Sequence, residues 1–210
     1  MQEHLFSTPR SARYFTLGSP ENAAEVWFVC HGYGQLAARF LERFRPIDAK
    51  RRCIVAPEGL SRFYLTESAT ERRVGASWMT REDRLHEIDD YVRYLDALYS
   101  HIAPGPARVT AFGFSQGTAT VCRWAALGSS RIDRLILWGG EVPPDLDLKR
   151  LRVPSLTLVY GTRDQFFPPK VVAANEARLR EHKIGYDLVA FDGAHELSEP
   201  TLLQVAGARV

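Results

Sequence analysis

Long apolar runs are missing from this chain of 210 residues. No stretch approaches the roughly 20 consecutive apolar residues that a helix needs to cross a bilayer. Residues 1–9 have neither the basic start nor the apolar core of a secretion signal. We therefore expect a protein that has no membrane span and acts in the cytoplasm.

Cysteine is scarce, with only 3 residues: Cys30, Cys53 and Cys122. The number is odd, and each residue stands in an apolar run or a predicted helix. This pattern predicts buried free thiols in a reducing compartment rather than a framework of disulfides. A catalytic cysteine would need to stand in a sharp turn between a strand and a helix, and none of the three does so.

The chain has no large excess of positive or negative charge. Its 27 Lys and Arg residues are nearly balanced by 25 Asp and Glu residues, which gives a net charge of +2. The chain therefore has no strong field to attract polyanions. Short basic runs at 50–52 and 72–73 are interspersed with acids and are typical of solvated faces. We expect no nucleic-acid partner.

The sequence does contain an alternation of apolar and amphipathic segments throughout its length. With 45% hydrophobic residues and no linker rich in Pro, Gly or Ser, residues 1–210 fit a single domain with a sizeable core. Alternating strands and helices predict an α/β fold, a mainly parallel twisted sheet with helices on both faces. The expected strands are 13–17, 26–30, 53–56, 109–112, 135–138, 156–160 and 186–191; the expected helices are 36–44, 82–99, 118–127, 169–181 and 196–206.

A Gly-x-Ser-x-Gly run, Gly113-Phe-Ser115-Gln-Gly117, stands between the predicted strand 109–112 and the predicted helix 118–127. That is the context of a nucleophile elbow, a turn that pushes the serine hydroxyl out above the sheet edge. Because neither flanking glycine has a side chain, we expect the strand and the helix to approach each other closely there. The alternative is a glycine-rich turn with a solvated serine.

Two more reactive side chains follow predicted strands. Asp164 comes just after the strand 156–160, and His195 comes after the strand 186–191. Taken singly, Asp164 could be a turn former and His195 a surface or capping histidine. Taken together with Ser115, they stand in the order nucleophile, acid, base, which differs from the order in trypsin or subtilisin. We predict that the three form a catalytic triad at the carboxyl ends of the strands, where open α/β sheets bind ligands.

A His-Gly-x-Gly loop, His31-Gly-Tyr33-Gly, follows the predicted strand 26–30. Such a loop can supply one backbone N–H group to an oxyanion hole, and the residue after the nucleophile supplies the other. We assign the two donors to the amides of Tyr33 and Gln116. The alternatives are a plain turn or a phosphate-binding loop, but the chain has no Gly-Lys-Ser/Thr and no third spaced glycine.

With these motifs in place, the chain resembles the phospholipase/carboxylesterase branch of the α/β hydrolases, which includes acyl-protein thioesterases and bacterial carboxylesterases. The resemblance runs from about Val26 to the end of the chain. It implies the α/β-hydrolase fold, no metal or organic cofactor, and hydrolysis of carboxylic esters or thioesters. One departure is Gln35-Leu36-Ala37, where thioesterase members usually carry a small polar or acidic residue.

The segment from Pro57 to Met79 is distinctive and follows a predicted strand, so it could line the substrate pocket. Aromatic and apolar residues in it, together with two phenylalanines after Asp164, could form apolar walls. The alternative is that these side chains pack in the core or cover a loop. The candidate pocket residues are Phe63, Tyr64, Leu65, Trp78, Met79, Phe166 and Phe167.

We therefore predict a serine carboxylesterase that takes small-molecule esters of small to medium acyl groups through an acyl-enzyme on Ser115. The alternative enzyme is a thioesterase acting on acylated proteins or coenzyme A thioesters, with peptidase and phospholipase activities less favoured. A catalytically silent module that binds a small ligand or a protein is the competing class. No residue pattern separates ester from thioester substrates, or a monomer from a homodimer.

Overall fold

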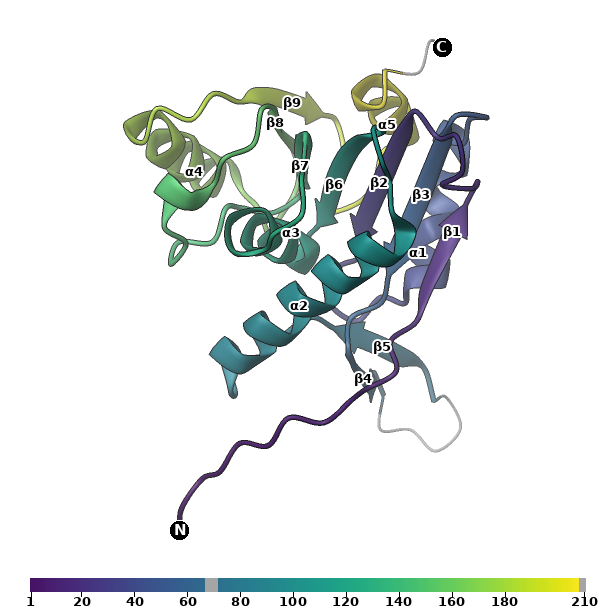
Figure 1. The fold of residues 1–210 in the computed structure, drawn as a ribbon. Helices are drawn as coiled ribbons and strands as arrows, with labels where there is room; N and C mark the ends of the chain where they lie inside the picture. Colours follow the sequence, from purple (N-terminus) through teal and green to yellow (C-terminus); the bar gives the residue numbers. More distant parts are fainter. Residues whose placement is uncertain (67–71, 208–210) are drawn as a thin grey trace.

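The computed structural model describes residues 1–66 and 72–207, and its centre is a 7-stranded sheet (Figure 1). The strand order is β1-β3-β2-β6-β7-β8-β9, and only β1 runs antiparallel to its neighbour. A separate hairpin is formed by β4 and β5. The strands are β1 (Tyr14–Leu17), β2 (Glu25–Cys30), β3 (Arg52–Pro57), β4 (Ser61–Tyr64), β5 (Val74–Ser77), β6 (Arg108–Phe114), β7 (Arg134–Trp138), β8 (Leu156–Gly161) and β9 (Asp187–Phe191).

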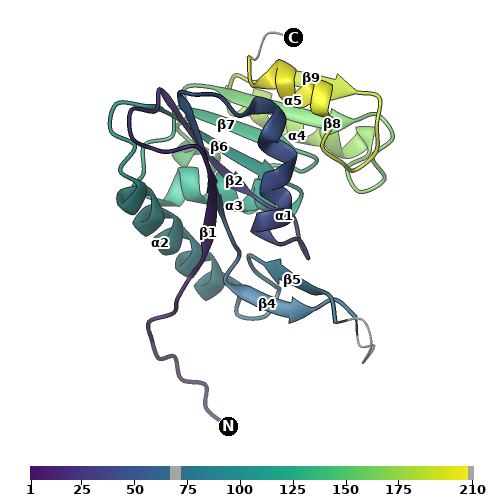
Figure 2. The ribbon, with the colours of Figure 1, turned by 90° about the vertical axis from the view of Figure 1, so that its right-hand side faces the viewer.

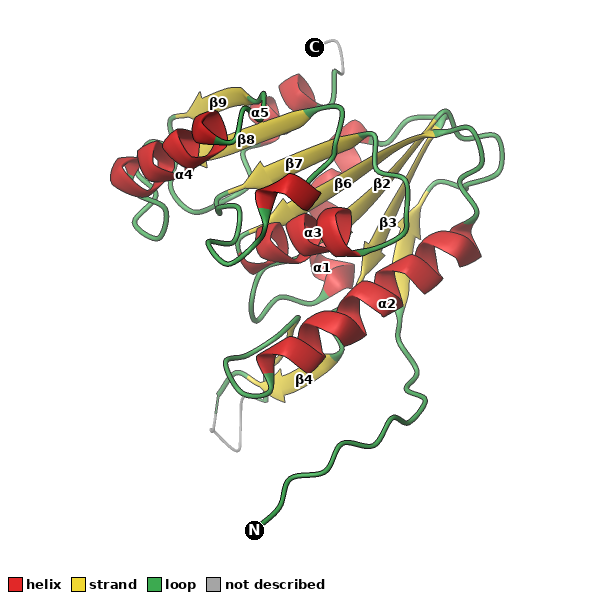
Figure 3. Ribbon diagram, turned by 60° about the vertical axis from the view of Figure 1, so that its left-hand side comes forward, coloured by secondary structure: helices red, strands yellow, loops and turns green. Residues whose placement is uncertain are grey.

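Helices cover both faces of the sheet, as the alternating pattern predicted. Figure 2 shows α1 and α5 in front of the sheet, and Figure 3 shows α2, α3 and α4 in front of the opposite face. The helices are α1 (Ala37–Leu41), α2 (Arg84–Ile102), α3 (Gln116–Leu127), α4 (Pro169–Glu181) and α5 (Glu199–Val205), with short 3-10 helices η1 (Glu42–Ile47) and η2 (Leu148–Arg150). Among the described residues, no helix combines the length and the apolar character that crossing a bilayer requires.

Two apolar clusters fill the spaces between the sheet and the helices. Successive residues of β2 alternate between them, because side chains along a strand point to opposite faces. Trp27 packs with Phe44 and Leu202 on the α1 and α5 side, whereas Phe28 packs with Trp124 on the other side. Burial on both faces explains why β2 is a continuous apolar run rather than an alternating one.

Three segments differ from the sequence expectation. The helix expected at 36–44 is α-helical only to Leu41 and continues as 3-10 to Ile47, with Pro46, which has no N–H to donate, inside it. The last helix begins at Glu199 rather than at 196, with the side chain of Ser198 as its cap. The hairpin β4–β5 was not predicted; it lies within the 57–79 segment, of which 67–71 fall outside the described residues.

The prediction of buried free thiols is confirmed, since Cys30, Cys53 and Cys122 are all free and buried. Burial raises the pKa of each thiol, that of Cys53 to about 11. The thiols are therefore protonated at neutral pH, and they lack the thiolate character of a nucleophile.

Candidate active site

Ser115 stands between β6 and α3 in a strained backbone conformation. Its φ is 54° and its ψ is −118°, a region that residues with a side chain rarely adopt. The glycines around it allow this turn. A Cβ on Gly117 would lie 2.2 Å from the carbonyl oxygen of Cys30, and a Cβ on Gly113 would lie 2.3 Å from the carbonyl oxygen of Gly117. The close approach predicted for both glycines is confirmed.

The loops that follow β2 and β7 flank the serine. The N–H of Ser115 donates to the carbonyl oxygen of Trp138 at 3.0 Å, which joins the elbow to the end of β7. An added Cβ on Gly32 would lie 3.1 Å from the Cβ of Ser115, and one on Gly140 would lie 2.9 Å from the Ser115 carbonyl oxygen. Ser115 is therefore held between two glycine-containing loops at the carboxyl end of the sheet.

Asp164 and His195 come from the ends of β8 and β9 and are joined by a hydrogen bond. The distance from His195 Nδ1 to Asp164 Oδ2 is 2.7 Å. The other carboxylate oxygen, Oδ1, accepts the N–H groups of Phe166 at 2.9 Å and Phe167 at 3.0 Å. These bonds satisfy a carboxylate that is only 4% exposed and fix its orientation toward the imidazole.

His195 lies close to the glycine loop that touches Ser115. A Cβ on Gly139 would be 3.2 Å from the imidazole ring, while the neighbouring Gly140 contacts the serine backbone. The ring also packs against Phe114 and Phe166, with centroids 4.9 and 5.0 Å away. Among the described residues, the structure has no hydrogen bond between the Ser115 hydroxyl and His195.

Near Ser115, the backbone N–H groups of Tyr33 and Gln116 have no partner among the described residues. Two neighbouring amides of the Tyr33 loop are paired. The N–H of Gly32 donates to the side chain of Gln35 at 2.8 Å, and that of Gly34 donates to the carbonyl oxygen of Ala76 at 2.9 Å. Tyr33 and Gln116 are the residues whose amides the motifs singled out as oxyanion donors.

His31 positions this loop, a role that the sequence did not indicate. Its ring is buried, with Nδ1 2.8 Å from the carbonyl oxygen of Gly32, and its Nε2 accepts the N–H of Gly59 at 3.0 Å. Accepting at Nε2 places the proton on Nδ1, so the ring is neutral. Burial lowers its pKa, although the hydrogen bond to Gly32 and the charge of Glu58 oppose the change.

No protein-family model and no curated protein sequence matches this chain. Solved structures do match. Zea mays acyl-protein thioesterase 2 aligns with a TM-score of 0.75 at 14% identity, over 94% of this chain and 97% of that one. The chain has the α/β-hydrolase fold. A carboxylesterase from Mesorhizobium loti aligns at 0.73 and 19% identity over 93% of each chain, and the esterase PE8 at 0.70 and 19% identity over 94% of this chain and 97% of that one.

In this α/β-hydrolase fold, a cavity of about 410 Å³ opens beside His195. It lies between the loop after β2, the helical segment that follows it, the β4–β5 hairpin and the loop after β9. Its lining residues are Gly34, Gln35, Leu36, Arg39, Phe40, Arg43, Leu65, Arg73, Val74, Phe114, His195, Glu196 and Leu197.

Leu65 is the one predicted pocket residue in that lining, and the six aromatic and Met candidates are absent from it. Trp78 and Phe167 are 2% and 7% exposed and belong to the core. Met79 packs against that core, and its sulfur lies 3.4 Å from the guanidinium of Arg123. The expectation fails for these three because their apolar side chains pack in or against the core instead of facing the cavity.

The remaining three candidates are half-buried or exposed and lie outside the cavity lining. Phe63 packs on Tyr33 with ring centroids 5.1 Å apart, which places it beside the oxyanion loop. Tyr64 is exposed, and Phe166 is 81% exposed although its ring contacts His195. Phe63 and Phe166 thus lie beside the site without lining the cavity.

The side chain of Gln116 explains why the stretch after β5 faces inward. Its Oε1 accepts the N–H of Trp78 at 3.1 Å, and its Nε2 donates to the carbonyl oxygen of Met79 at 2.8 Å. Gln116, the residue after Ser115, thus holds this stretch against the turn between β6 and α3. Sequence motifs give no signal for these two hydrogen bonds, because Trp78 and Met79 are 38 and 37 positions away from Gln116.

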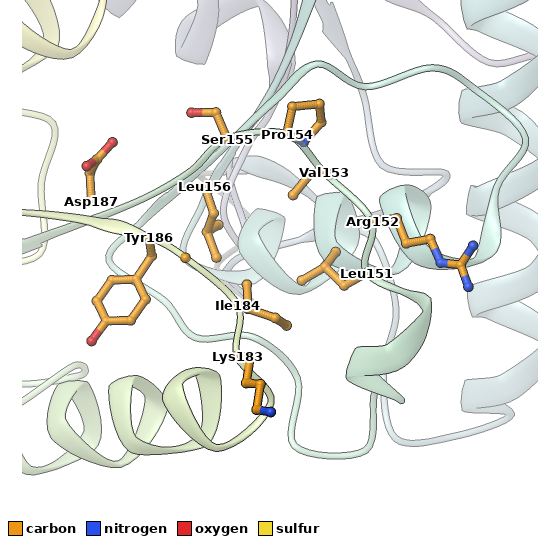
Figure 4. Close-up of a pocket in the computed structure, with 11 residues that line it drawn as sticks. Leu151, Arg152, Val153, Pro154, Ser155, Leu156, Lys183, Ile184, Tyr186 and Asp187 are labelled. Carbon is orange, nitrogen blue, oxygen red and sulfur yellow. The ribbon is translucent and has the colours of Figure 1, made fainter.

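A second hollow, of about 570 Å³, lies at the opposite end of the sheet (Figure 4). It is lined by residues 151–156, which lead into β8, and by residues 183–187, which lead into β9. Those are the amino ends of the strands whose carboxyl ends lead to Asp164 and His195. None of the predicted site residues contributes to this hollow, so it is separate from the candidate active site.

Proposed function

We propose that this chain hydrolyses carboxylic esters of small to medium acyl groups through an acyl-enzyme on Ser115. The observation that carries the proposal is the 2.7 Å bond between His195 and a buried Asp164, next to a serine in a strained elbow. The fold shared with esterases and an acyl-protein thioesterase is consistent with it. No step requires a metal or an organic cofactor.

The reaction follows from the chemistry of these groups. Asp164 accepts a hydrogen bond from the Nδ1–H of His195, which leaves Nε2 without a proton. Nε2 can then take the proton of the Ser115 hydroxyl as the Ser115 oxygen attacks the carbonyl carbon of the ester. The N–H groups of Tyr33 and Gln116 stabilise the oxyanion, and each such donor contributes about 3 kcal/mol in a known protease. His195 then protonates the leaving alcohol, and a water activated by the same ring releases the acid.

Labelling with a fluorophosphonate tests the assignment directly. The wild-type chain should react covalently and hydrolyse p-nitrophenyl butyrate, whereas Ser115→Ala should do neither and should keep its circular dichroism spectrum. Ser7→Ala, in the exposed segment before β1, is the matched control and should label like the wild type. Labelling that persists in Ser115→Ala rejects the nucleophile. A wild type that neither labels nor hydrolyses favours a silent binding module.

Thioester hydrolysis is the second candidate, because one of the matched structures is an acyl-protein thioesterase. An oxygen ester and a thioester with the same acyl group and the same alkyl leaving group distinguish the two. A higher kcat/KM for the oxygen ester supports the carboxylesterase proposal. A much higher value for the thioester replaces it.

A further inference from the structure

Three arginines line the cavity beside His195: Arg39, Arg43 and Arg73. Among the described residues, the only carboxylate in the lining is that of Glu196. The cavity therefore carries an excess of positive charge, in a protein whose total charge is close to neutral at +2. A local concentration of one sign next to reactive groups concentrates ligands of the other sign.

The three cations come from two sides of the cavity. Arg39 lies in α1 and Arg43 in η1, four positions apart on successive helical turns, so they share one face of this helical segment. Arg73 immediately precedes β5, which is tied to the oxyanion loop by the bond from Gly34 to Ala76. Helix and hairpin thus contribute cations to a single hollow.

Among the described residues, none of the three guanidinium groups forms an ion pair or a hydrogen bond. By contrast, Arg45 of η1 binds Glu42, and Arg52 at the start of β3 binds Glu25 at 2.7 Å. The carboxylate of Glu196 accepts the N–H of Ala194 at 3.3 Å rather than an arginine. All three are exposed, and none has a partner among the described residues. Like charges around one hollow repel each other, and a bound anion would relieve that repulsion.

The rest of the cavity wall is largely apolar. Six side chains supply it: Leu36, Phe40, Leu65, Val74, Phe114 and Leu197. A ligand that fits both parts has a short apolar body and an anionic end. Arginine suits carboxylate and phosphate groups in particular, because its planar fork can donate two parallel hydrogen bonds.

We propose that the preferred substrates are esters or thioesters that carry a carboxylate or phosphate a few carbon atoms from the scissile carbonyl, and that Arg39, Arg43 and Arg73 bind this anion. The inference rests on the proposed ester hydrolysis at Ser115. It adds a substrate class, since the hydrolytic chemistry itself requires no charge on the ester.

The test compares two esters with the same leaving group, the mono-p-nitrophenyl ester of glutaric acid and p-nitrophenyl pentanoate. The wild type should prefer the anionic ester in kcat/KM. In the triple variant Arg39→Gln, Arg43→Gln, Arg73→Gln, the ratio of the two kcat/KM values should fall at least about tenfold, mainly through KM. Each single variant should lower the ratio by a smaller factor, which covers the case in which the triple variant folds poorly.

Arg150→Gln is the matched control, because this exposed arginine lies in η2 and is outside the cavity lining. It should leave the ratio unchanged. Glu196→Gln should raise the ratio, since it removes the one carboxylate that the described part of the wall contains. Inorganic phosphate and glutarate, added as inhibitors of the neutral ester, show which anion binds more tightly.

A wild type that hydrolyses both esters equally, or a triple variant that keeps the preference, overturns the inference and leaves the proposed function standing. A wild type that hydrolyses neither ester and resists fluorophosphonate labelling overturns the proposed function and this inference with it.

Discussion

The indole N–H of Trp78 donates a hydrogen bond of 2.9 Å to the carbonyl oxygen of His31, and the two rings pack with centroids 5.1 Å apart. This contact joins the residue that follows β5 to the start of the loop that carries the Tyr33 amide. A carbonyl at the base of the loop is thereby fixed from outside the loop. The position of the Tyr33 amide, the proposed oxyanion donor, depends on a partner 47 positions away.

Trp78→Phe should therefore lower kcat as well as stability. The ring remains, but the loss of the donor leaves a buried carbonyl oxygen unpaired, at a cost of about 1–3 kcal/mol. The matched control is Trp124→Phe, which removes the indole bond to Asp96 on the far side of the core. Thermal unfolding and ester kinetics should show that both variants lose stability and that only Trp78→Phe loses kcat. Equal kcat values in the two variants would argue against a positioning role for Trp78.

Asp164→Asn should reduce kcat about 10³–10⁴-fold while the fold is retained. Asparagine has a single acceptor oxygen, so it cannot accept both the Phe166 and Phe167 N–H groups and the Nδ1–H of His195 as the carboxylate does. The effect is of this size in a serine protease triad. Asp192→Asn is the control, since Asp192 is near His195 in sequence but is exposed and paired with Arg163. Kinetics with a neutral p-nitrophenyl ester measure both. Activity within tenfold of the wild type in Asp164→Asn would contradict the assigned acid.

Stability should decrease as the pH falls below about 6.5, and His31 should account for part of the decrease. Burial lowers the pKa of His31 in the folded chain, so the unfolded chain binds a proton there at a higher pH than the folded chain does. Protonation thus favours unfolding over the interval between the two pKa values. The pKa of exposed His86 is raised by Asp83, which acts in the opposite direction.

Urea unfolding of the wild type and His31→Gln at pH 7 and pH 5 isolates the contribution of His31, because His86 is present in both. The variant should be less stable at pH 7, and the difference between the two proteins should shrink at pH 5. A difference that stays constant between the two pH values would show that His31 does not titrate in this way.

Much of the fold follows from local patterns. The strands expected at 26–30 and 156–160 are observed as Glu25–Cys30 and Leu156–Gly161, and the helix expected at 169–181 is observed as Pro169–Glu181. Their apolar runs and helix start signals lie within each segment. The β4–β5 hairpin was missed because its strands are short and partly exposed, and they depend on pairing with each other across 67–71.

The candidate site, like the fold, was predictable from the sequence only in part. Ser115 and its flanking glycines form a contiguous motif, and the chain order of Asp164 and His195 is also visible in the sequence. The pocket was not predictable from composition, because Trp78 has the same aromatic character whether it lines a cavity or packs in the core. The hydrogen bond from Trp78 to His31 holds the Trp78 ring in the core. Local periodicity gives no signal for this contact, because the two residues are 47 positions apart.

By itself, the sequence determined the strand and helix pattern, the tight turn around Ser115 and the order of the reactive residues, since turn chemistry and apolar periodicity depend on neighbours along the chain. Only the tertiary structure decided which aromatic side chains became core, which amides near Ser115 stayed unpaired and which arginines gathered beside His195. Burial and pairing depend on partners that folding brings from far along the chain.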